Sequence, residues 1–592
     1  MDADTMIAGK QVIRRTAAKK GACLWLAAAM LGGCADPEGP TPSSEPPIEQ
    51  SSPAPVEPSA FDAATESAAA TISGERIREV VAEIAHDRYA GRAPGTAGDK
   101  SARAYLAAQL EQIGFEPGAA DSGWEQPVEL VGISAAAPAK WRFVNGEATI
   151  ELARSEDFVA ASGVQSARAE VPDTELVFVG YGIEAPEYQW DDFKGVDVTG
   201  KVLVMLNNDP DWDPELFAGM ERLYYGRWMY KYESAARHGA TGAIIIHTTP
   251  SAGYPWQVVQ SSWSGEQFEL PASDAPRIRV EAWITEDAAR RLLGPAGNLD
   301  GLIEQAKRRD FVPVPLGIRT SLTLRNTLTQ TQSANVLGVL RGSDPNLADE
   351  FVIYSAHHDH LGIGEPNPAG EAGDNIYNGA RDNASGVGML LAIGKAYSSL
   401  AERPRRSVML LFPAAEEQGL LGSEYYAAHP TVPPGRIAAN VNYDSGNIWG
   451  PTHDITFIGL GKSSLDDIAV AVAEHQGRTL KSDEFPDRGS YYRSDQFNFA
   501  KIGVPAFYFN GGTDFIGRPE GWGVEQVNAY TERDYHQPSD ELTPDWNFEG
   551  MVQDAQFGFL AGLAVANDTK LPMWNPGNEF EAARKTAIAA AE

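Results

Sequence analysis

Short apolar runs alternate with helical stretches through the second half of the chain. The runs at residues 351–354, 408–412 and 504–509 are dominated by Val, Leu, Phe and other apolar residues, as is typical of strands buried on both faces. Residues 386–400 predict a helix, and residues 98–114 place apolar side chains at helical spacing before a terminal glycine. This alternation predicts an α/β fold with a mixed, mostly parallel sheet, helices on both faces and a ligand site at the carboxyl ends of the strands.

Residues 165–305 have a different pattern. Apolar runs occur at 175–182, 200–206 and 239–246, but we find there none of the ligand-rich strand ends of the second half. We therefore expect a separate α/β or β-rich unit inserted into a larger domain, which would consist of residues 74–164 and 306–592.

The first residues predict an export signal. Basic residues precede an apolar stretch at 21–33 that is too short to span a bilayer. The stretch ends in Leu-Gly-Gly-Cys34, which resembles a bacterial lipobox in which Cys34 is lipidated; the alternative is an ordinary signal with a chance cysteine. Residues 1–33 would be removed, and the Pro-, Ser- and Glu-rich residues 34–73 would form a tether. These features predict a periplasmic or cell-surface lipoprotein anchored to a bacterial membrane.

Composition narrows the function. The 592 residues include 81 Asp and Glu against 48 Lys and Arg, and no basic cluster suits nucleic acid. The only cysteines, Cys23 and Cys34, precede the folded region, which excludes thiol catalysis there. The sequence also lacks a G-x-S-x-G elbow, an H-E-x-x-H helix and a P-loop.

Imidazole and carboxylate groups follow several of the predicted strands. His357 and Asp359 come directly after residues 351–354, and neutral imidazole with nearby carboxylate is a donor set that zinc prefers. Further groups of this kind are Asp382, Glu416, Glu417, Asp444, Asp534, His536 and Asp540. Each motif alone has an ordinary alternative: a polar loop, a helix cap or a solvated surface pair.

As an ordered set, these motifs resemble the co-catalytic di-zinc aminopeptidases of metallopeptidase family 28. The resemblance covers about residues 75–160 and 305–570, and the expected ligand types occur in the expected order. It implies the zinc aminopeptidase fold and a pair of zinc ions (Zn²⁺, two per chain). Asp382 would bridge them, His357 and Asp444 would complete one site, and Glu417 and His536 would complete the other.

The resemblance also implies catalytic roles. Glu416 would be the general base, Asp359 would orient His357, and Tyr535 would stabilise the carbonyl oxygen. The segment 165–305 resembles a protease-associated domain, a common insertion in this family.

Three positions depart from the family pattern. Gln496 stands where relatives often have His, Arg381 where many have an acidic or small residue, and Asp444 lies in Tyr-Asp-Ser rather than Leu-Asp-Met. Because the proposed ligands are all present, these departures bear on substrate preference more than on metal binding.

The sequence therefore predicts an exported zinc exopeptidase, first of all an aminopeptidase that releases N-terminal residues from peptides. One alternative is a carboxypeptidase or dipeptidase for acidic or small dipeptides, with Arg381 and Arg493 as candidates to bind a carboxylate. Others are a single-zinc enzyme that cyclises N-terminal glutamine and a catalytically inactive binding protein. The expected partners are peptides and, through Cys34, a membrane, but no nucleic acid.

Overall fold

The computed structural model describes residues 61–294, 298–364 and 373–592. The predicted export signal, the lipidation site Cys34 and most of the tether lie outside these residues. Within the described part, no helix is both long and apolar enough to cross a membrane.

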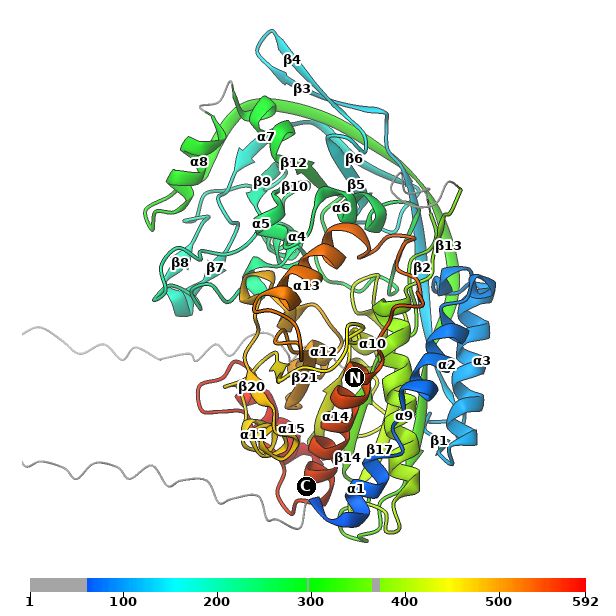
Figure 1. The fold of residues 1–592 in the computed structure, drawn as a ribbon. Helices are drawn as coiled ribbons and strands as arrows, with labels where there is room; N and C mark the ends of the chain where they lie inside the picture. Colours follow the sequence, from blue (N-terminus) through cyan, green and yellow to red (C-terminus); the bar gives the residue numbers. More distant parts are fainter. Residues whose placement is uncertain (1–60, 295–297, 365–372) are drawn as a thin grey trace, which may run out of the picture. The chain divides into compact units, whose positions relative to one another are not determined.

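One region holds a mixed sheet (Figure 1). Four adjacent strands in the middle run parallel to one another, and the strand on each side of these four runs antiparallel to its neighbour among them. In spatial order the strands are β13 (Val314–Leu340), β17 (Ser407–Phe412), β14 (Phe351–Ser355), β18 (Ile437–Asn442), β21 (Ala506–Gly511), β19 (Asp454–Phe457) and β20 (Thr479–Lys481). The predicted mixed, mostly parallel α/β class is confirmed.

The central strands are buried on both faces because successive side chains point to opposite sides. In β14, Val352 and Tyr354 join one core, whereas Phe351 and Ile353 join another. The first core contains side chains from α2 (Gly74–Ile84), α3 (Ala97–Gln112), α9 (Ser385–Ser399), α11 (Leu465–Gln476) and α14 (Glu549–Asn567). The second contains side chains from α10 (Leu421–Ala428) and α12 (Gln496–Lys501). Helices therefore cover both faces, and the helices predicted at 98–114 and 386–400 are confirmed as α3 and α9.

Ordered structure begins before residue 74, where the tether was expected to end. Helix α1 (Ala63–Ala69) is capped by Asp62, and its Ala68 and Ala69 are buried in the first core together with Ile72. The expected boundary was wrong because these small apolar side chains pack despite the polar composition of the segment before them.

A second region contains residues 165–305, where an inserted unit was expected. Its strands lie in the order β6 (Arg168–Phe178), β9 (Val202–Leu206), β10 (Gly242–His247), β12 (Val280–Thr285) and β5 (Phe158–Ser162). Its main core extends from Trp141 to Leu324, so the predicted limits of 165 and 305 were too narrow. The reason is that β3 (Lys140–Asn145), β4 (Ala148–Ala153) and β5 pair with β13, with each other and with β12.

Continuous β-strands, rather than a flexible linker, connect the two regions. Strand β13 is 27 residues long; its beginning pairs with β6, and its end pairs with β17. Strand β2 (Glu125–Ala136) runs antiparallel beside it, as Figure 1 shows along the edge of both regions. The second region is therefore tied to the main sheet by continuous hydrogen-bonded strands.

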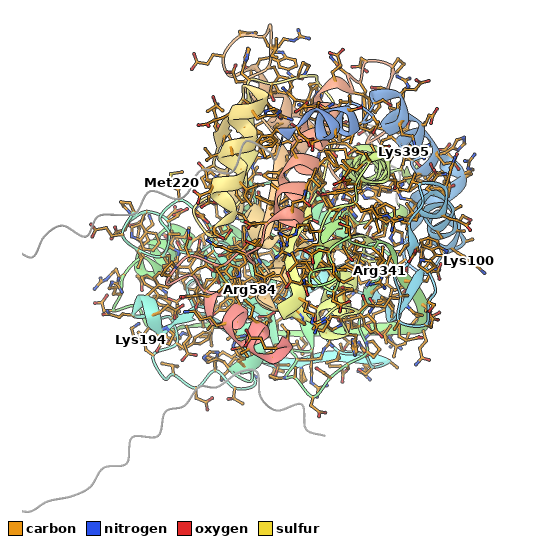
Figure 2. All side chains as sticks on the ribbon, turned by 90° about the horizontal axis from the view of Figure 1, so that it is seen from below. Lys100, Lys194, Met220, Arg341, Lys395 and Arg584 are labelled. Atoms are coloured by element: carbon orange, nitrogen blue, oxygen red, sulfur yellow. The ribbon has the colours of Figure 1, made fainter. Side chains whose placement is uncertain are left out.

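The C-terminal helix α15 (Glu581–Ala591) is held by a buried arginine. Arg584 is fully buried and donates to the carbonyl oxygens of Pro572 and Ile437. Figure 2 labels Arg584 together with Met220, which is 66% exposed. Because Ile437 begins β18, this contact joins the end of the chain to the central sheet.

Candidate active site

The candidate site lies at the carboxyl ends of neighbouring parallel strands. His357 follows β14, Glu416 and Glu417 follow β17, and Asp444 follows β18. Because these strands are adjacent and parallel, their ends meet at one edge of the sheet. The side chains predicted from the sequence are thereby brought together from positions far apart in the chain.

The remaining predicted ligands come from loops beside helices. Asp382 lies in an irregular turn just before α9, and His536 follows α13 (Trp522–Arg533). Asp540 accepts hydrogen bonds from the backbone N–H groups of Arg381 and Asp382, both at 3.0 Å. Asp540 thus fixes the turn that carries Asp382.

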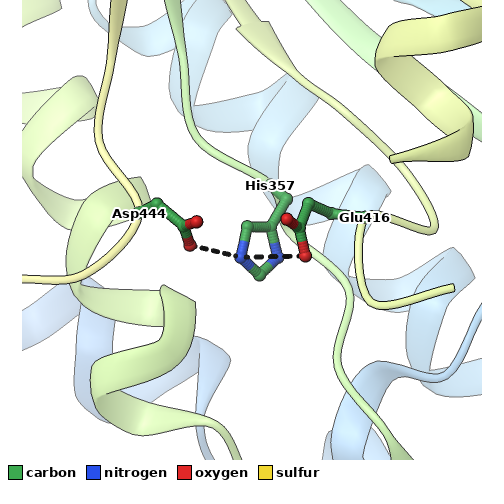
Figure 3. Close-up of side chains that lie close together, drawn as sticks. All are labelled: His357, Glu416 and Asp444. Atoms are coloured by element: carbon green, nitrogen blue, oxygen red, sulfur yellow. Dashed lines mark hydrogen bonds and ion pairs between the residues drawn. The ribbon is translucent and has the colours of Figure 1, made fainter. Parts of the chain in front are cut away.

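His357 is surrounded by carboxylates (Figure 3). Its Nε2 lies 3.0 Å from Asp444 Oδ1, 3.2 Å from Asp382 Oδ1 and 3.8 Å from Glu416 Oε2. The imidazole is 1% exposed. One buried nitrogen therefore faces three acidic side chains.

His536 forms a second group of the same kind. Its Nε2 lies 3.0 Å from Glu417 Oε2 and 3.4 Å from Asp382 Oδ2. The two oxygens of Asp382 thus face two different imidazoles, which is the arrangement expected of a carboxylate that bridges two cations.

Charge and burial shift the pKa values of this cluster strongly. Burial would raise the pKa of Asp382, but His357 and His536 hold it well below its usual value. Burial likewise opposes ionisation of Glu417, yet His536 lowers the pKa of that carboxyl to about 2. For Glu416, burial and the neighbouring carboxylates Asp444 and Glu417 outweigh His357 and raise the pKa well above its usual value.

The donor set fits zinc. Among the described residues, the carboxylates of the cluster form ion pairs only with histidines and never with Lys or Arg; these carboxylates are Asp382, Glu416, Glu417 and Asp444. The buried oxygen Asp382 Oδ1 also has no hydrogen-bond partner there. Crowded, buried carboxylates are costly without a cation, and imidazole nitrogen with carboxylate oxygen is a typical zinc environment. The residues that would hold the metal are His357, Asp382, Glu417, Asp444 and His536.

Asp359 does not orient His357 as expected. The distance from Asp359 Oδ1 to His357 Nδ1 is 3.8 Å, too long for a hydrogen bond. Asp359 instead accepts hydrogen bonds from the backbone N–H groups of Glu416 (3.0 Å) and Glu417 (3.4 Å). The carboxylate of Asp359 therefore fixes the turn after β17, because the N–H groups of that turn lie closer to it than the His357 imidazole does.

Two residues that the sequence analysis left without a role contact the ligands. His360 Nδ1 lies 2.6 Å from Glu417 Oε1; the run of histidines at 357–360 was its only sequence signal. Ser262 belongs to α6 (Trp256–Ser262) of the second region, and its Oγ lies 2.9 Å from His536 Nδ1. Nothing in the sequence pointed to Ser262, because the contact joins positions that are far apart in the chain.

Strained backbone occurs at two positions of the site. Ala415, just before Glu416, has φ 53°, and His536 has φ 56°. Residues other than glycine rarely adopt positive φ, and such conformations concentrate at functional sites. The backbone at Ala415 directs the proposed base Glu416 into the cluster, and the backbone at His536 directs the imidazole of this proposed ligand there.

A cavity of about 420 Å³ opens beside the cluster. Its lining includes Glu416 and Tyr535 from the first region and Trp228 and Tyr254 from the second. The Tyr535 ring lies 4.0 Å from the His536 ring, centroid to centroid. A molecule in this cavity would contact both regions and the carboxylate cluster.

A family comparison agrees with this geometry: residues 335–560 match the model of peptidase family M28. This part of the chain is therefore similar to peptidase family M28. The M28 match includes every proposed metal ligand and the segment that carries the central parallel strands.

Two curated relatives of the chain are named as aminopeptidases. The chain is 33% identical over 239 residues to aminopeptidase NAALADL1 of Rattus norvegicus, covering 32% of this chain and 30% of the relative. It is 26% identical over 263 residues to probable leucine aminopeptidase 2 of Aspergillus oryzae, covering 43% and 49%. The chain thus spans about half or less of the length of these relatives.

A solved structure resembles the fold over nearly its whole length. The aminopeptidase from Aneurinibacillus sp. strain AM-1 superposes with a TM-score of 0.50 at 18% identity, covering 86% of this chain and 97% of that one. This similarity concerns the fold, and it extends to parts of the chain outside the M28 match.

Proposed function

We propose that this protein is a zinc-dependent aminopeptidase that hydrolyses the N-terminal peptide bond of peptides. The observation that carries the proposal is Asp382, whose two oxygens face His357 and His536 while each imidazole also meets a carboxylate of its own. This arrangement suits a pair of zinc ions, and the aminopeptidase names of the relatives favour that activity.

Zinc, when bound, acts as a Lewis acid that polarises a carbonyl group and makes water more acidic. The protein has to supply a base that takes up the proton of the attacking water. Glu416 lines the cavity and lies beside His357 without belonging to either proposed ligand trio. Because its carboxylate lies next to the proposed ligands and faces the cavity, Glu416 is suited to accept this proton and deliver it to the leaving amine.

Tyr535 is placed to orient the scissile carbonyl. It lines the cavity next to His536 and receives a hydrogen bond from Arg493 Nη2 at 3.2 Å. Burial raises the pKa of Tyr535, so the phenol stays protonated and can donate to a carbonyl oxygen. We assign Tyr535 this role in holding the substrate.

Metal analysis and a substrate panel test the proposal together. The protein purified without chelator should contain about two zinc ions per chain, and it should hydrolyse aminoacyl nitroanilides. Hydrolysis of N-blocked dipeptides alone would replace the aminopeptidase with a carboxypeptidase. A content near one zinc with cyclisation of N-terminal glutamine, or no zinc and no turnover, would overturn the proposal.

We further propose that the enzyme is an exported lipoprotein anchored through Cys34, and that its second region is a protease-associated domain. The basic and apolar pattern of residues 1–33 and the lipobox-like Leu-Gly-Gly-Cys34 support the first proposal. Mass spectrometry of the membrane fraction should find a lipidated N-terminal Cys34. An unmodified mature N-terminus elsewhere would contradict this.

A further inference from the structure

Arg92 is a buried arginine whose side chain binds backbone carbonyl groups. It ends the short turn Asp87–Arg92 between α2 and α3, and it is 1% exposed. Among the described residues, its side-chain hydrogen bonds all go to backbone carbonyl oxygens and none goes to a carboxylate. A buried cation is costly unless its donors are satisfied, so these carbonyl groups are what keeps Arg92 in place.

The guanidinium group of Arg92 bridges two loops that carry proposed zinc ligands. Its Nε donates to His358 O at 2.8 Å, directly after the ligand His357. Its Nη1 donates to Asn378 O at 2.5 Å and its Nη2 to Gly379 O at 3.1 Å, both in the turn that precedes α9. Because the guanidinium is planar and rigid, it fixes the loop after β14 relative to this turn.

The same arginine is anchored to the body of the first region. Its Nη1 also donates to Ile84 O, at the end of α2, at 2.9 Å. Its own carbonyl oxygen accepts from the N–H of His360 at 3.4 Å. The backbone of Arg92 has φ 51°, a conformation that residues other than glycine rarely adopt and that concentrates at functional sites. Strained backbone thus occurs here as it does at Ala415 and His536.

The turn before α9 is held through both kinds of backbone group. Arg92 binds its carbonyl oxygens, and Asp540 binds its N–H groups. Gly379 has φ 55° and approaches His360 so closely that an added Cβ would lie 2.5 Å from the imidazole Cγ. The protein's own contacts therefore place Asp382 opposite its two imidazoles.

Arg92 also brings a fixed positive charge to the cluster. Burial lowers its pKa to about 10, while carboxylates, first Asp359 and then Asp540, act in the opposite direction. The side chain is therefore protonated at neutral pH. A lysine would supply the same charge, but its three donors belong to one nitrogen instead of a planar fork. Charge and geometry can thus be separated by one substitution.

We propose that Arg92 is a positioning residue for the zinc pair, which locks the loop of His357 to the turn of Asp382 before metal binds. Arg92 is not among the described residues that line the cavity, so it acts through the ligands and not on the substrate. The inference rests on the proposed zinc-dependent function and assigns the group that preorganises its metal site.

Chelator competition measures the effect on zinc binding. Arg92→Lys keeps the charge but cannot hold four carbonyl oxygens at once, so it should bind zinc about 10- to 100-fold more weakly, as when other groups that orient metal ligands are lost. Unchanged zinc affinity in the folded variant would overturn the proposal and leave the zinc-dependent function standing. A wild type that binds no zinc would overturn that function itself, so the two failures are distinguishable.

Arg584→Lys is the matched control for a merely structural role. Arg584 is also fully buried, and its side chain likewise donates to backbone carbonyl oxygens, including those of Pro572 and Ile437. Ile437 begins β18, whereas the proposed ligands follow the opposite ends of the strands. Denaturant unfolding of the metal-free proteins should show lower stability in both variants, but only Arg92→Lys should lose zinc affinity. An equal loss of zinc affinity in both variants would contradict the proposal.

A measurement on the wild type decides the case in which Arg92→Lys does not fold. The N–H groups of Ala380 and Asp382 both donate to Asp540. If the protein itself holds this turn, these groups should exchange with deuterium equally slowly in the metal-free and the zinc-loaded protein. Exchange more than about tenfold faster without zinc would mean that the metal orders the turn, and it would overturn the proposal.

Discussion

Both regions of this molecule end parallel, doubly buried strands with a buried histidine, yet the two histidines have opposite properties. His247 ends β10 in the second region, and His357 follows β14 in the first region. Burial lowers the pKa of His247 to about 4, and its Nε2–H donates to Tyr254 O at 3.1 Å. Burial acts on His357 in the same direction, but Glu416, Asp382 and Asp444 outweigh it and raise the pKa well above its usual value.

The surrounding charges explain the difference. In the second region, two buried acidic groups accept hydrogen bonds from the backbone: Asp209 Oδ2 from the N–H of Leu223, and Asp192 Oδ2 from that of Ile183. The buried Lys231 lies close enough to influence the pKa of both carboxyls. Around His357, carboxylates outnumber cations. A strand end therefore becomes a candidate metal centre through an excess of acidic groups, not through a histidine alone.

Replacing each of the two imidazoles with an amide should give the largest difference between the two histidines. His357→Asn should reduce the zinc content from about two to about one per chain, or to none, and abolish peptide hydrolysis because a direct ligand is lost. His247→Gln should retain the zinc, since the amide still donates to Tyr254 O. Metal analysis of both variants decides this, and equal zinc content in the two would contradict the assignment of His357.

Glu416→Gln separates the base from the ligands beside it. The variant should keep its zinc but lose about 10²- to 10⁴-fold in kcat, because the amide cannot accept the proton of water. Glu424→Gln, on helix α10 outside the cavity lining, is the control and should retain activity. Unchanged turnover in Glu416→Gln would rule out its role.

His247 predicts a pH effect with a defined sign. In the unfolded chain this imidazole takes up its proton near the ordinary histidine pKa of 6.5, whereas the folded protein resists protonation down to about pH 4. Relative to His247→Gln, the wild type should therefore lose about 3 kcal/mol of stability as pH falls from 6.5 to 4, and none above 6.5. Thermal unfolding of both proteins across this range measures it; parallel pH profiles would show that His247 is not buried as a neutral group.

Substitution of Ser262 should have the smallest effect. This residue of the second region contacts His536 of the first region. When His536 binds metal through Nε2, its Nδ1–H donates to Ser262 Oγ. Ser262→Ala should weaken zinc binding at that site by about 10- to 100-fold, as other outer partners of metal-binding histidines do. Ser264→Ala, whose hydroxyl donates to Ser261 O instead, should bind zinc normally in chelator competition. Equal affinities in the two variants would assign no positioning role to Ser262.

Much of the first region could be predicted from local sequence patterns. The runs at 351–354 and 408–412 appear as β14 and β17 within one residue, and the helices at 98–114 and 386–400 appear as α3 and α9. Continuous apolar runs and helical spacing are strong signals because they reflect burial directly. The limits of the second region were misplaced because β13 belongs to both regions, and a strand of 27 residues has no sequence marker at the point where its partners change.

The sequence by itself determined the α/β class and the residue types at the strand ends, because both follow from patterns within a few neighbouring residues. Only the tertiary structure decided which groups meet: the two oxygens of Asp382 between two imidazoles, Asp359 on the backbone of the Glu416 turn, and Ser262 beside His536. A charge becomes unpaired and available to a ligand through what surrounds it in space, and that surrounding is assembled from distant parts of the chain.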